Sequence, residues 1–279
     1  MLVNLDYVLK DAQKNGYGVG LFNTTDTDML EAVIAAAEEL RAPVVIGTAE
    51  VLLPSGELKL IAPALIAAAK RATVPVVVHF DHGLTFDRCM EALQLGFSSI
   101  MYDGSVHPYE ENLANTREIV KIAHSFGATV EGEIGHVGQA DQDDNNAADL
   151  YTKVEEAVAY QQATGVDALA ISIGTAHGAY KSKPKLDFKR LSEIHAAMDT
   201  PLVLHGGSGL TDEDFQNVVK YGISKVNIYT DLCVAGIEAT EAAIKEGGLS
   251  YLAIRDRKVE AIKQAAIKKM KIFGCENKA

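Results

Sequence analysis

Several features that define other classes of protein are scarce in this sequence of 279 residues. Its three cysteines, Cys89, Cys233 and Cys275, lie far apart without a C-x-x-C pair, so we expect reduced thiols with no bridging role. No apolar run approaches the ~20 residues of a membrane-spanning helix, and the first residues lack the basic and apolar regions of a secretion signal. We therefore expect a cytoplasmic protein that does not enter a membrane.

Positive charge is also scarce. The chain carries 26 Lys and Arg against 38 Asp and Glu, a formal net charge of −12. Such a surface repels phosphate backbones and anionic lipid headgroups, which argues against nucleic-acid and membrane partners. A small anionic substrate held in a local pocket remains compatible with this charge.

Eight short apolar runs, separated by segments of helical periodicity such as 29–40 and 58–70, predict the fold. The runs are residues 18–23, 43–48, 74–81, 98–103, 129–135, 168–174, 201–207 and 225–230. Buried strands alternating with helices indicate a parallel sheet, and eight such units favour a closed (β/α)₈ TIM barrel over an open doubly wound sheet. We expect one barrel domain over residues 1–279, with a C-terminal helical extension at about 251–273.

Nearly every run ends in a polar residue or a glycine. These ends are Asn23, Thr48, Asp81, Asp103, Glu133, Gly174, His205 and Asn227. In a TIM barrel the carboxyl ends of the strands form the active-site rim. The pattern therefore predicts a polar site on that rim.

Three histidines follow strand ends on this rim: His82, His177 and His205. Three imidazoles can hold zinc in a tetrahedron with one position open for substrate, which is the arrangement of catalytic zinc sites. A single histidine is more often a core or surface residue, but three on one rim favour the metal site. His79 lies on the same strand face as Asp81 and is expected to support the site without being a ligand.

Six motifs carry a family resemblance. They are HFDHG (79–83), SIMYDGS (99–105), VEGEIGHVG (130–138), GTAHGAYK (174–181), LHGGSG (204–209) and KVNIYTDL (225–232). In this order and spacing, from about Asp6 to Phe273, the chain resembles class II fructose- and tagatose-bisphosphate aldolases. The resemblance implies a zinc-dependent lyase of carbohydrate metabolism that reversibly cleaves a ketose (bis)phosphate into dihydroxyacetone phosphate and an aldehyde. It also implies a homo-oligomer, a dimer or a tetramer.

The resemblance assigns roles around the metal. It makes His82, His177 and His205 the zinc ligands, and the zinc stabilises the enediolate left when the bond from carbon 3 to carbon 4 breaks. Asp81 becomes the acid-base group at the carbon 4 hydroxyl. Glu133 and Asp103 match positions near the metal, with Glu133 an alternative ligand. Either carboxylate could instead orient a histidine.

The resemblance also assigns the phosphate site. Small residues after His205 let backbone amides point at an anion, and Thr211 can cap the helix that follows. The residues that would hold substrate and its phosphate are Asn23, Gly178, Lys181, Gly206, Gly207, Ser208, Asn227 and Thr230. A monovalent cation near the phosphate is a further candidate cofactor.

Three departures from the family pattern bear on the substrate. Ala49 stands where a serine often contacts substrate, and the loop carboxylate that protonates the carbanion could be Asp141 or Asp143, unless this loop is only a solvated acidic turn. Leu252 stands where an arginine binds the second phosphate, although Arg255 and Arg257 lie close by. An alternative substrate is therefore a ketose 1-phosphate without a second phosphate.

Other functions use the same residues. A metal-dependent sugar-phosphate isomerase or epimerase would form the enediolate without breaking the carbon chain. A barrel that binds sugar phosphate without turnover is the non-enzymatic alternative. A Schiff-base aldolase is disfavoured, because no lysine ends a predicted strand and Lys225 begins one.

Overall fold

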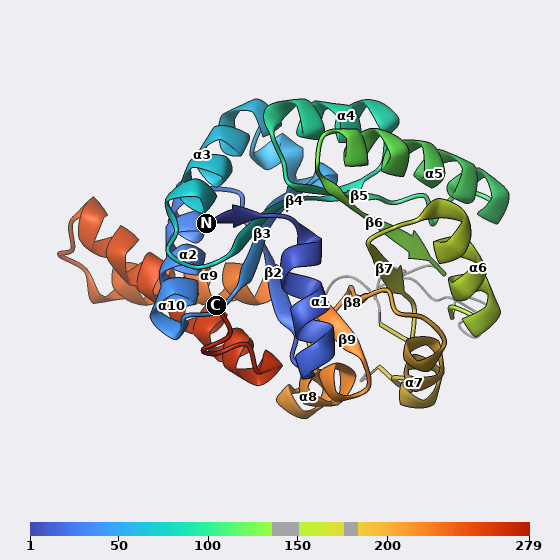
Figure 1. Cartoon of the computed structure of the whole chain (residues 1–279). Coiled ribbons are helices and arrows are strands. Elements are labelled where there is room, and N and C mark those ends of the chain that lie inside the picture. Colours follow the sequence, from blue (N-terminus) through green and yellow to red (C-terminus); the bar gives the residue numbers. More distant parts are fainter. Residues whose placement is uncertain (136–150, 176–183) are drawn as a thin grey trace.

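The computed structural model describes residues 1–135, 151–175 and 184–279. Eight parallel strands pair in the order β4-β3-β2-β9-β8-β7-β6-β5, and a further pairing of β5 with β4 closes the barrel (Figure 1). The strands are β2 (Val19–Asn23), β3 (Val44–Ala49), β4 (Val76–Gly83), β5 (Ser99–Tyr102), β6 (Thr129–Ile134), β7 (Ala168–Ile171), β8 (Leu202–Leu204) and β9 (Ile223–Ile228). Each overlaps a predicted run, and the predicted (β/α)₈ TIM barrel is confirmed.

Helices surround the barrel. They are α1 (Leu5–Asn15), α2 (Thr27–Leu40), α3 (Leu58–Arg71), α4 (Phe86–Leu95), α5 (Tyr109–Ser125), α6 (Val154–Thr164), α7 (Phe188–Ala197), α8 (Asp212–Lys220), α9 (Thr230–Glu246) and α10 (Tyr251–Phe273), with the 3₁₀ turn η1 (Glu50–Ser55) after β3. A short strand that was not predicted, β1 (Leu2–Val3), pairs with β4. Helix α1 lies at the end where the strands begin, where the Leu5 amide donates to Thr129 Oγ1 at 3.0 Å.

The strands owe their apolar composition to burial on both faces. Every residue of β2, β3, β6 and β7 is buried, because side chains fill the barrel on one face and helices cover the other. Asn23, Asp81 and Asn227 lie near the carboxyl ends of their strands, where a pocket opens. Among the described helices, none combines the length and the apolar character that crossing a bilayer demands.

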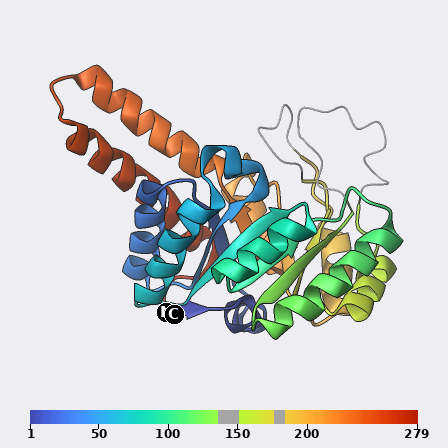
Figure 2. The same ribbon diagram turned by 90° about the horizontal axis from the view of Figure 1, so that it is seen from above.

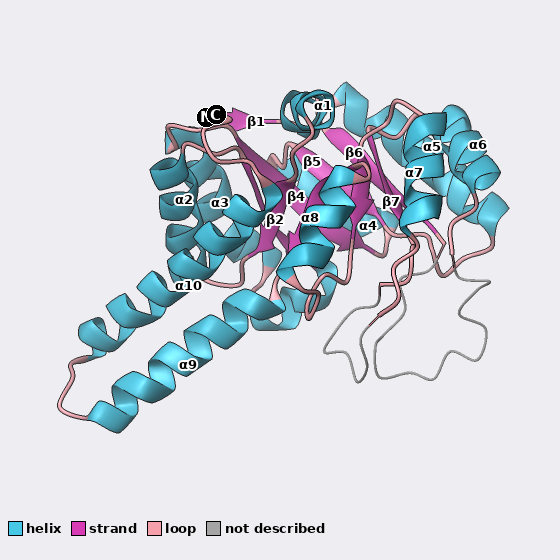
Figure 3. Ribbon diagram, turned by 90° about the horizontal axis from the view of Figure 1, so that it is seen from below, coloured by secondary structure: helices cyan, strands magenta, loops and turns pink. Residues whose placement is uncertain are grey.

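Helices α9 and α10 form a hairpin that extends beyond the barrel (Figures 2 and 3). The base of α10 packs on α2 and carries Phe273 into the core, edge-on to Phe215. Along α10, Arg255 Nε lies 2.8 Å from Asp28 Oδ1, and Lys258 Nζ lies 2.5 Å from Asp28 Oδ2. These contacts attach the hairpin to the start of α2.

Candidate active site

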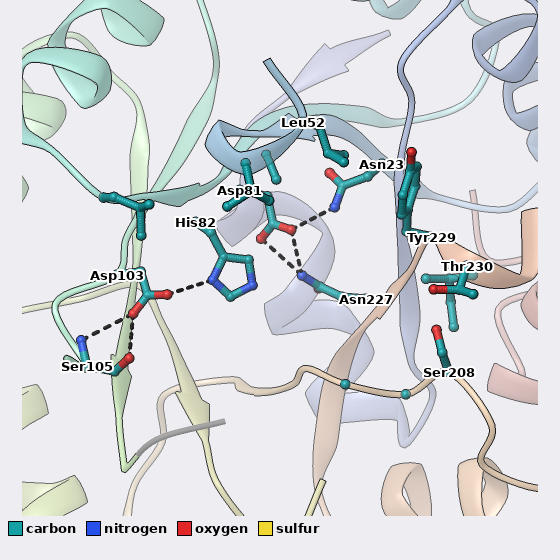
Figure 4. Close-up of a pocket in the computed structure, with 16 residues that line it drawn as sticks. Asn23, Leu52, Asp81, His82, Asp103, Ser105, Ser208, Asn227, Tyr229 and Thr230 are labelled. Carbon is teal, nitrogen blue, oxygen red and sulfur yellow. Dashed lines mark hydrogen bonds and ion pairs between the residues drawn. The ribbon is translucent and has the colours of Figure 1, made fainter. Parts of the chain in front are cut away.

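A pocket of about 380 Å³ opens at the carboxyl ends of the strands. It brings together five side chains from four strand ends: Asn23, Asp81, His82, Asp103 and Asn227 (Figure 4). All five had been predicted as site residues. The barrel collects them because parallel strands place their carboxyl ends on the same rim.

The end of β4 turns two neighbouring side chains in different directions. His82 has a φ of 44°, a left-handed conformation that is uncommon outside glycine. The pairing of β4 with β5 also shifts register between Phe80 and Gly83. This local irregularity places Asp81 beside Asn23 and Asn227 while His82 faces Asp103 (Figure 4). Such strained positions persist at functional sites because the surrounding structure holds them.

The Asp81 carboxylate is buried and accepts hydrogen bonds from two side-chain amides. Asn23 Nδ2 donates to Oδ2 at 2.7 Å, and Asn227 Nδ2 donates to Oδ1 at 3.0 Å. Burial by itself would raise the pKa of Asp81, but the positive charges of His82 and Lys225 hold that pKa well below its usual range. Asp81 is therefore an ionised carboxylate at neutral pH.

Asp103 holds the His82 ring. Its Oδ2 lies 2.8 Å from His82 Nδ1, and its Oδ1 accepts the Ser105 hydroxyl at 2.6 Å. Burial would lower the pKa of His82, but the Asp81 charge and the Asp103 hydrogen bond raise it to about 10. A carboxylate bonded to an imidazole in this way can orient the ring, which is one of the two roles predicted for Asp103.

His205 belongs to a network in which it, Glu131 and Lys225 are fully buried. Its Nε2 lies 2.8 Å from Glu131 Oε1, and Lys225 Nζ lies 2.8 Å from Glu131 Oε2. Lys225 also donates to Asn227 Oδ1 at 2.8 Å. Burial would raise the pKa of Glu131, but the charge of Lys225 and the hydrogen bond with His205 lower it to about 2. Burial and the charge of His82 lower the pKa of His205.

Sequence reasoning missed Glu131 and Lys225 as parts of the site. A signal was present, because Glu131 and Glu133 alternate in an otherwise apolar run and therefore share one face of β6. His79 lies beside the site: it is buried, its Nδ1 lies 2.8 Å from Ser99 Oγ, and its Nε2 lies 3.9 Å from Asp81. Burial lowers the pKa of His79 to about 3, so this ring is neutral.

The donor set fits a metal ion. One ligand atom from each of Asp81, His82 and His205 lies within 4.8 Å of the others, and the same holds for His82, Asp103 and Glu133. The ring centroids of His82 and His205 are 4.5 Å apart. Each ring has one nitrogen bonded to a carboxylate, the arrangement that orients metal-binding histidines. The third predicted ligand, His177, lies outside the described residues.

Beside this cluster, the segment after β8 lines the pocket with Gly206, Gly207 and Ser208. Gly206 has a φ of 66°, which glycine adopts without strain. Thr211 caps α8 as predicted, in a capping box with Asp214. Thr230, the first residue of α9, also lines the pocket, so the N-terminal end of that helix faces a position suited to an anion.

Gly178 and Lys181 lie outside the described residues, as do the two candidate proton donors, Asp141 and Asp143.

Comparisons with known proteins agree along the whole chain. Residues 3–278 match the family described as Fructose-bisphosphate aldolase class-II. The chain is 37% identical to a fructose-bisphosphate aldolase of Staphylococcus aureus, covering 100% of this chain and 99% of the relative. It is 38% identical to a 6-phospho-5-dehydro-2-deoxy-D-gluconate aldolase of Shouchella clausii, covering 98% and 94%. The crystal structure of the YdjI aldolase from Escherichia coli K12 has a TM-score of 0.91 at 34% identity, covering 100% of both chains.

Proposed function

The chain belongs to the class II fructose-bisphosphate aldolase family and is an aldolase, and from that premise we propose that it uses zinc to cleave a ketose phosphate. The products are dihydroxyacetone phosphate and an aldehyde, and the reaction is reversible. The observation that carries this proposal is the placement of ionised Asp81 beside two imidazoles whose ring centroids are 4.5 Å apart. A proton acceptor and a metal site then act on adjacent atoms of one substrate.

His82 and His205 would hold the ion together with His177, and Glu133 is the alternative ligand. A bound zinc ion would act as a Lewis acid that polarises the substrate carbonyl and takes up negative charge as the carbon chain breaks. Asp103 and Glu131 fix the two rings by hydrogen bonds of 2.8 Å. Imidazoles held in this way lose little freedom when they bind a metal.

Asp81 moves the proton that cleavage releases. In the cleavage direction its carboxylate accepts the proton of the carbon 4 hydroxyl, and the oxygen forms the aldehyde carbonyl as the bond to carbon 3 breaks. The electron pair of that bond stays with carbon 3, which then takes up one proton, from Asp141 or Asp143 in our proposal. In the condensation direction, carbon 3 first loses a proton and Asp81 returns its own to the new hydroxyl.

The phosphate of the dihydroxyacetone half would lie against Gly206, Gly207, Ser208 and Thr230, with Gly178 and Lys181 completing the site. The positive end of α9 favours an anion there. Asn227 lines the same pocket while its amide holds Asp81 at 3.0 Å, so it joins the phosphate side to the acid-base group. A monovalent cation near the phosphate stays a prediction.

We also propose that one barrel domain with its helical extension assembles into a homo-oligomer through the α9–α10 hairpin. The hairpin exposes five apolar side chains: Val234, Ile237, Ile244, Tyr251 and Leu252. Exposed apolar surface gathered on one projecting element is typical of a subunit contact. A cytoplasmic location stays a prediction.

The test is cleavage of fructose and tagatose mono- and bisphosphates by purified protein before chelation, after chelation and after zinc is restored. We expect cleavage that is lost with the metal and returns with it. Product analysis by NMR separates cleavage into two fragments from isomerisation to one rearranged sugar. Cleavage that persists without metal, or a single rearranged product, contradicts the proposal.

A further inference from the structure

The pocket has an apolar side that the proposed chemistry does not use. Three residues line this side: Val51 and Leu52 of η1, and Leu84, which follows β4. We call these three residues the apolar wall. Val51 is 64% exposed and Leu84 41% exposed. In Figure 4, Leu52 and Ser208 lie on opposite sides of the Asp81–Asn227 pair. Of the wall residues, Leu52 therefore lies near Asn23 and Asp81 and away from Ser208.

The apolar wall is a built surface. The Leu84 amide donates to Glu50 Oε2 at 2.7 Å, and this bond ties η1 to the segment after β4. Ala49, buried at the end of β3, continues the apolar lining where related enzymes often carry a serine. This part of the pocket lining therefore consists of aliphatic side chains.

The charges around the wall do not suit a second phosphate. Among the described residues that line the pocket there is no lysine or arginine, while Asp81 and Asp103 are both acidic. Arg255 Nη2 lies 2.5 Å from Glu31 in addition to its pair with Asp28. Arg257 Nη1 lies 2.5 Å from Glu246. Both arginines near the position of the missing family arginine are therefore engaged by carboxylates of their own chain.

Resting on the proposed function, we propose that the apolar wall binds the far end of the aldehyde and selects an uncharged one. The substrate class is a ketose 1-phosphate whose other end carries no phosphate. A second phosphate would lose water without gaining a lysine or arginine partner from the described residues that line the pocket. A hydroxylated or apolar carbon chain meets no such penalty.

The proposed function and this inference are tested separately on the zinc-loaded enzyme. Exchange of the carbon 3 hydrogen of dihydroxyacetone phosphate with D₂O, followed by NMR, needs no aldehyde and tests the proposed function alone. Condensation is then measured with glyceraldehyde, butanal and glyceraldehyde 3-phosphate. We expect kcat/KM for an unphosphorylated aldehyde to exceed that for glyceraldehyde 3-phosphate by about tenfold or more.

A preference for glyceraldehyde 3-phosphate while exchange is intact overturns this inference and leaves the proposed function standing. Absence of exchange overturns the proposed function and this inference with it.

A charge placed on the wall tests its position. Val51→Lys adds a cation at an exposed wall residue and should raise kcat/KM for glyceraldehyde 3-phosphate relative to glyceraldehyde by about tenfold. Leu60→Lys makes the same change on α3, at a residue that is 75% exposed and does not line the pocket, and should leave the ratio unchanged. Leu84→Lys is the second wall variant. An unchanged ratio in both folded wall variants, checked by circular dichroism, overturns the assignment.

Discussion

The Glu131 carboxylate lies 2.8 Å from the Lys225 ammonium, and both side chains are fully buried. The other oxygen of Glu131 lies 2.8 Å from His205, while Lys225 donates to Asn227. One buried ion pair thus connects β6 and β9 to a proposed metal ligand and to the amide that holds Asp81. The stability of the barrel and the geometry of its site depend on the same pair.

Breaking this pair should destabilise the fold strongly. Lys225→Met leaves the Glu131 charge buried without its partner, and we expect a loss of about 3–5 kcal/mol in the free energy of unfolding. Denaturant titration of the purified variant measures the change. The double variant Glu131→Gln with Lys225→Met removes both charges and should recover part of the loss. If the single variant were as stable as the wild type, the pair would carry no such energy.

Asp103 should control metal affinity without being essential to the fold. Asp103→Asn replaces the ionised partner of His82 Nδ1 by a neutral one, and we expect zinc affinity to fall about 10–100-fold. Competition with a chelating dye measures the affinity. Asp87→Asn, which removes an exposed carboxylate at the start of α4, is the matched control. Equal affinities in the two variants would show that Asp103 does not act through His82.

Zinc binding should strengthen as the pH rises. In the metal-free protein His82 has a pKa raised to about 10, so below that pH the ring carries a proton that a metal must displace. Apparent affinity should therefore increase, by up to about tenfold per pH unit, and the increase should end near the pKa of His82. Calorimetry at about pH 7 in buffers of different ionisation enthalpy counts the released protons. Zinc uptake with no proton release at this pH would contradict the prediction.

Removing the Asp81 carboxylate should stop the proton step while sparing the metal site. Asp81→Asn keeps the shape of the side chain but cannot take the carbon 4 proton, and we expect kcat for cleavage to fall about 10²–10⁴-fold. Zinc content, measured by atomic absorption, should stay near that of the wild type because His82 and His205 remain. Asp87→Asn again serves as the control with unchanged turnover. Cleavage at the wild-type rate in Asp81→Asn would remove Asp81 from the mechanism.

The exposed apolar side chains of the hairpin should govern assembly. Leu252→Glu places a charge on the proposed subunit contact, and we expect a lower molar mass by light scattering after size exclusion. Leu60→Glu makes the same change at an exposed leucine on α3 and should leave the mass unchanged. A Leu252→Glu protein with the wild-type mass would place the contact elsewhere.

The barrel could be predicted from the sequence because its signals are local. Each strand is a short apolar run that must be buried on both faces, and the helical period between runs leaves few alternatives to a parallel sheet. The run that ends in Asp81 and His82 shows how far this extends. Polar residues at the carboxyl end of this run predict an active-site rim there. The family resemblance then predicts a role for each of these two residues. The three described strand ends that carry Asn23, Asp103 and Asn227 were found in the same way.

Lys225 marks where this reasoning ends. The sequence predicts that Lys225 begins a strand, where its ammonium group would reach water. In the structure, β9 starts earlier, at Ile223, and Lys225 is completely buried. Its partner Glu131 is distant in sequence, and only closure of the barrel brings β6 and β9 near enough for the pair to form. The same holds for Arg255, whose attachment to Asp28 and Glu31 depends on how α10 packs against α2. Local sequence determined the strands and the chemistry at their ends; pairing between distant buried charges was decided by the tertiary structure, because it depends on distances that no local pattern encodes.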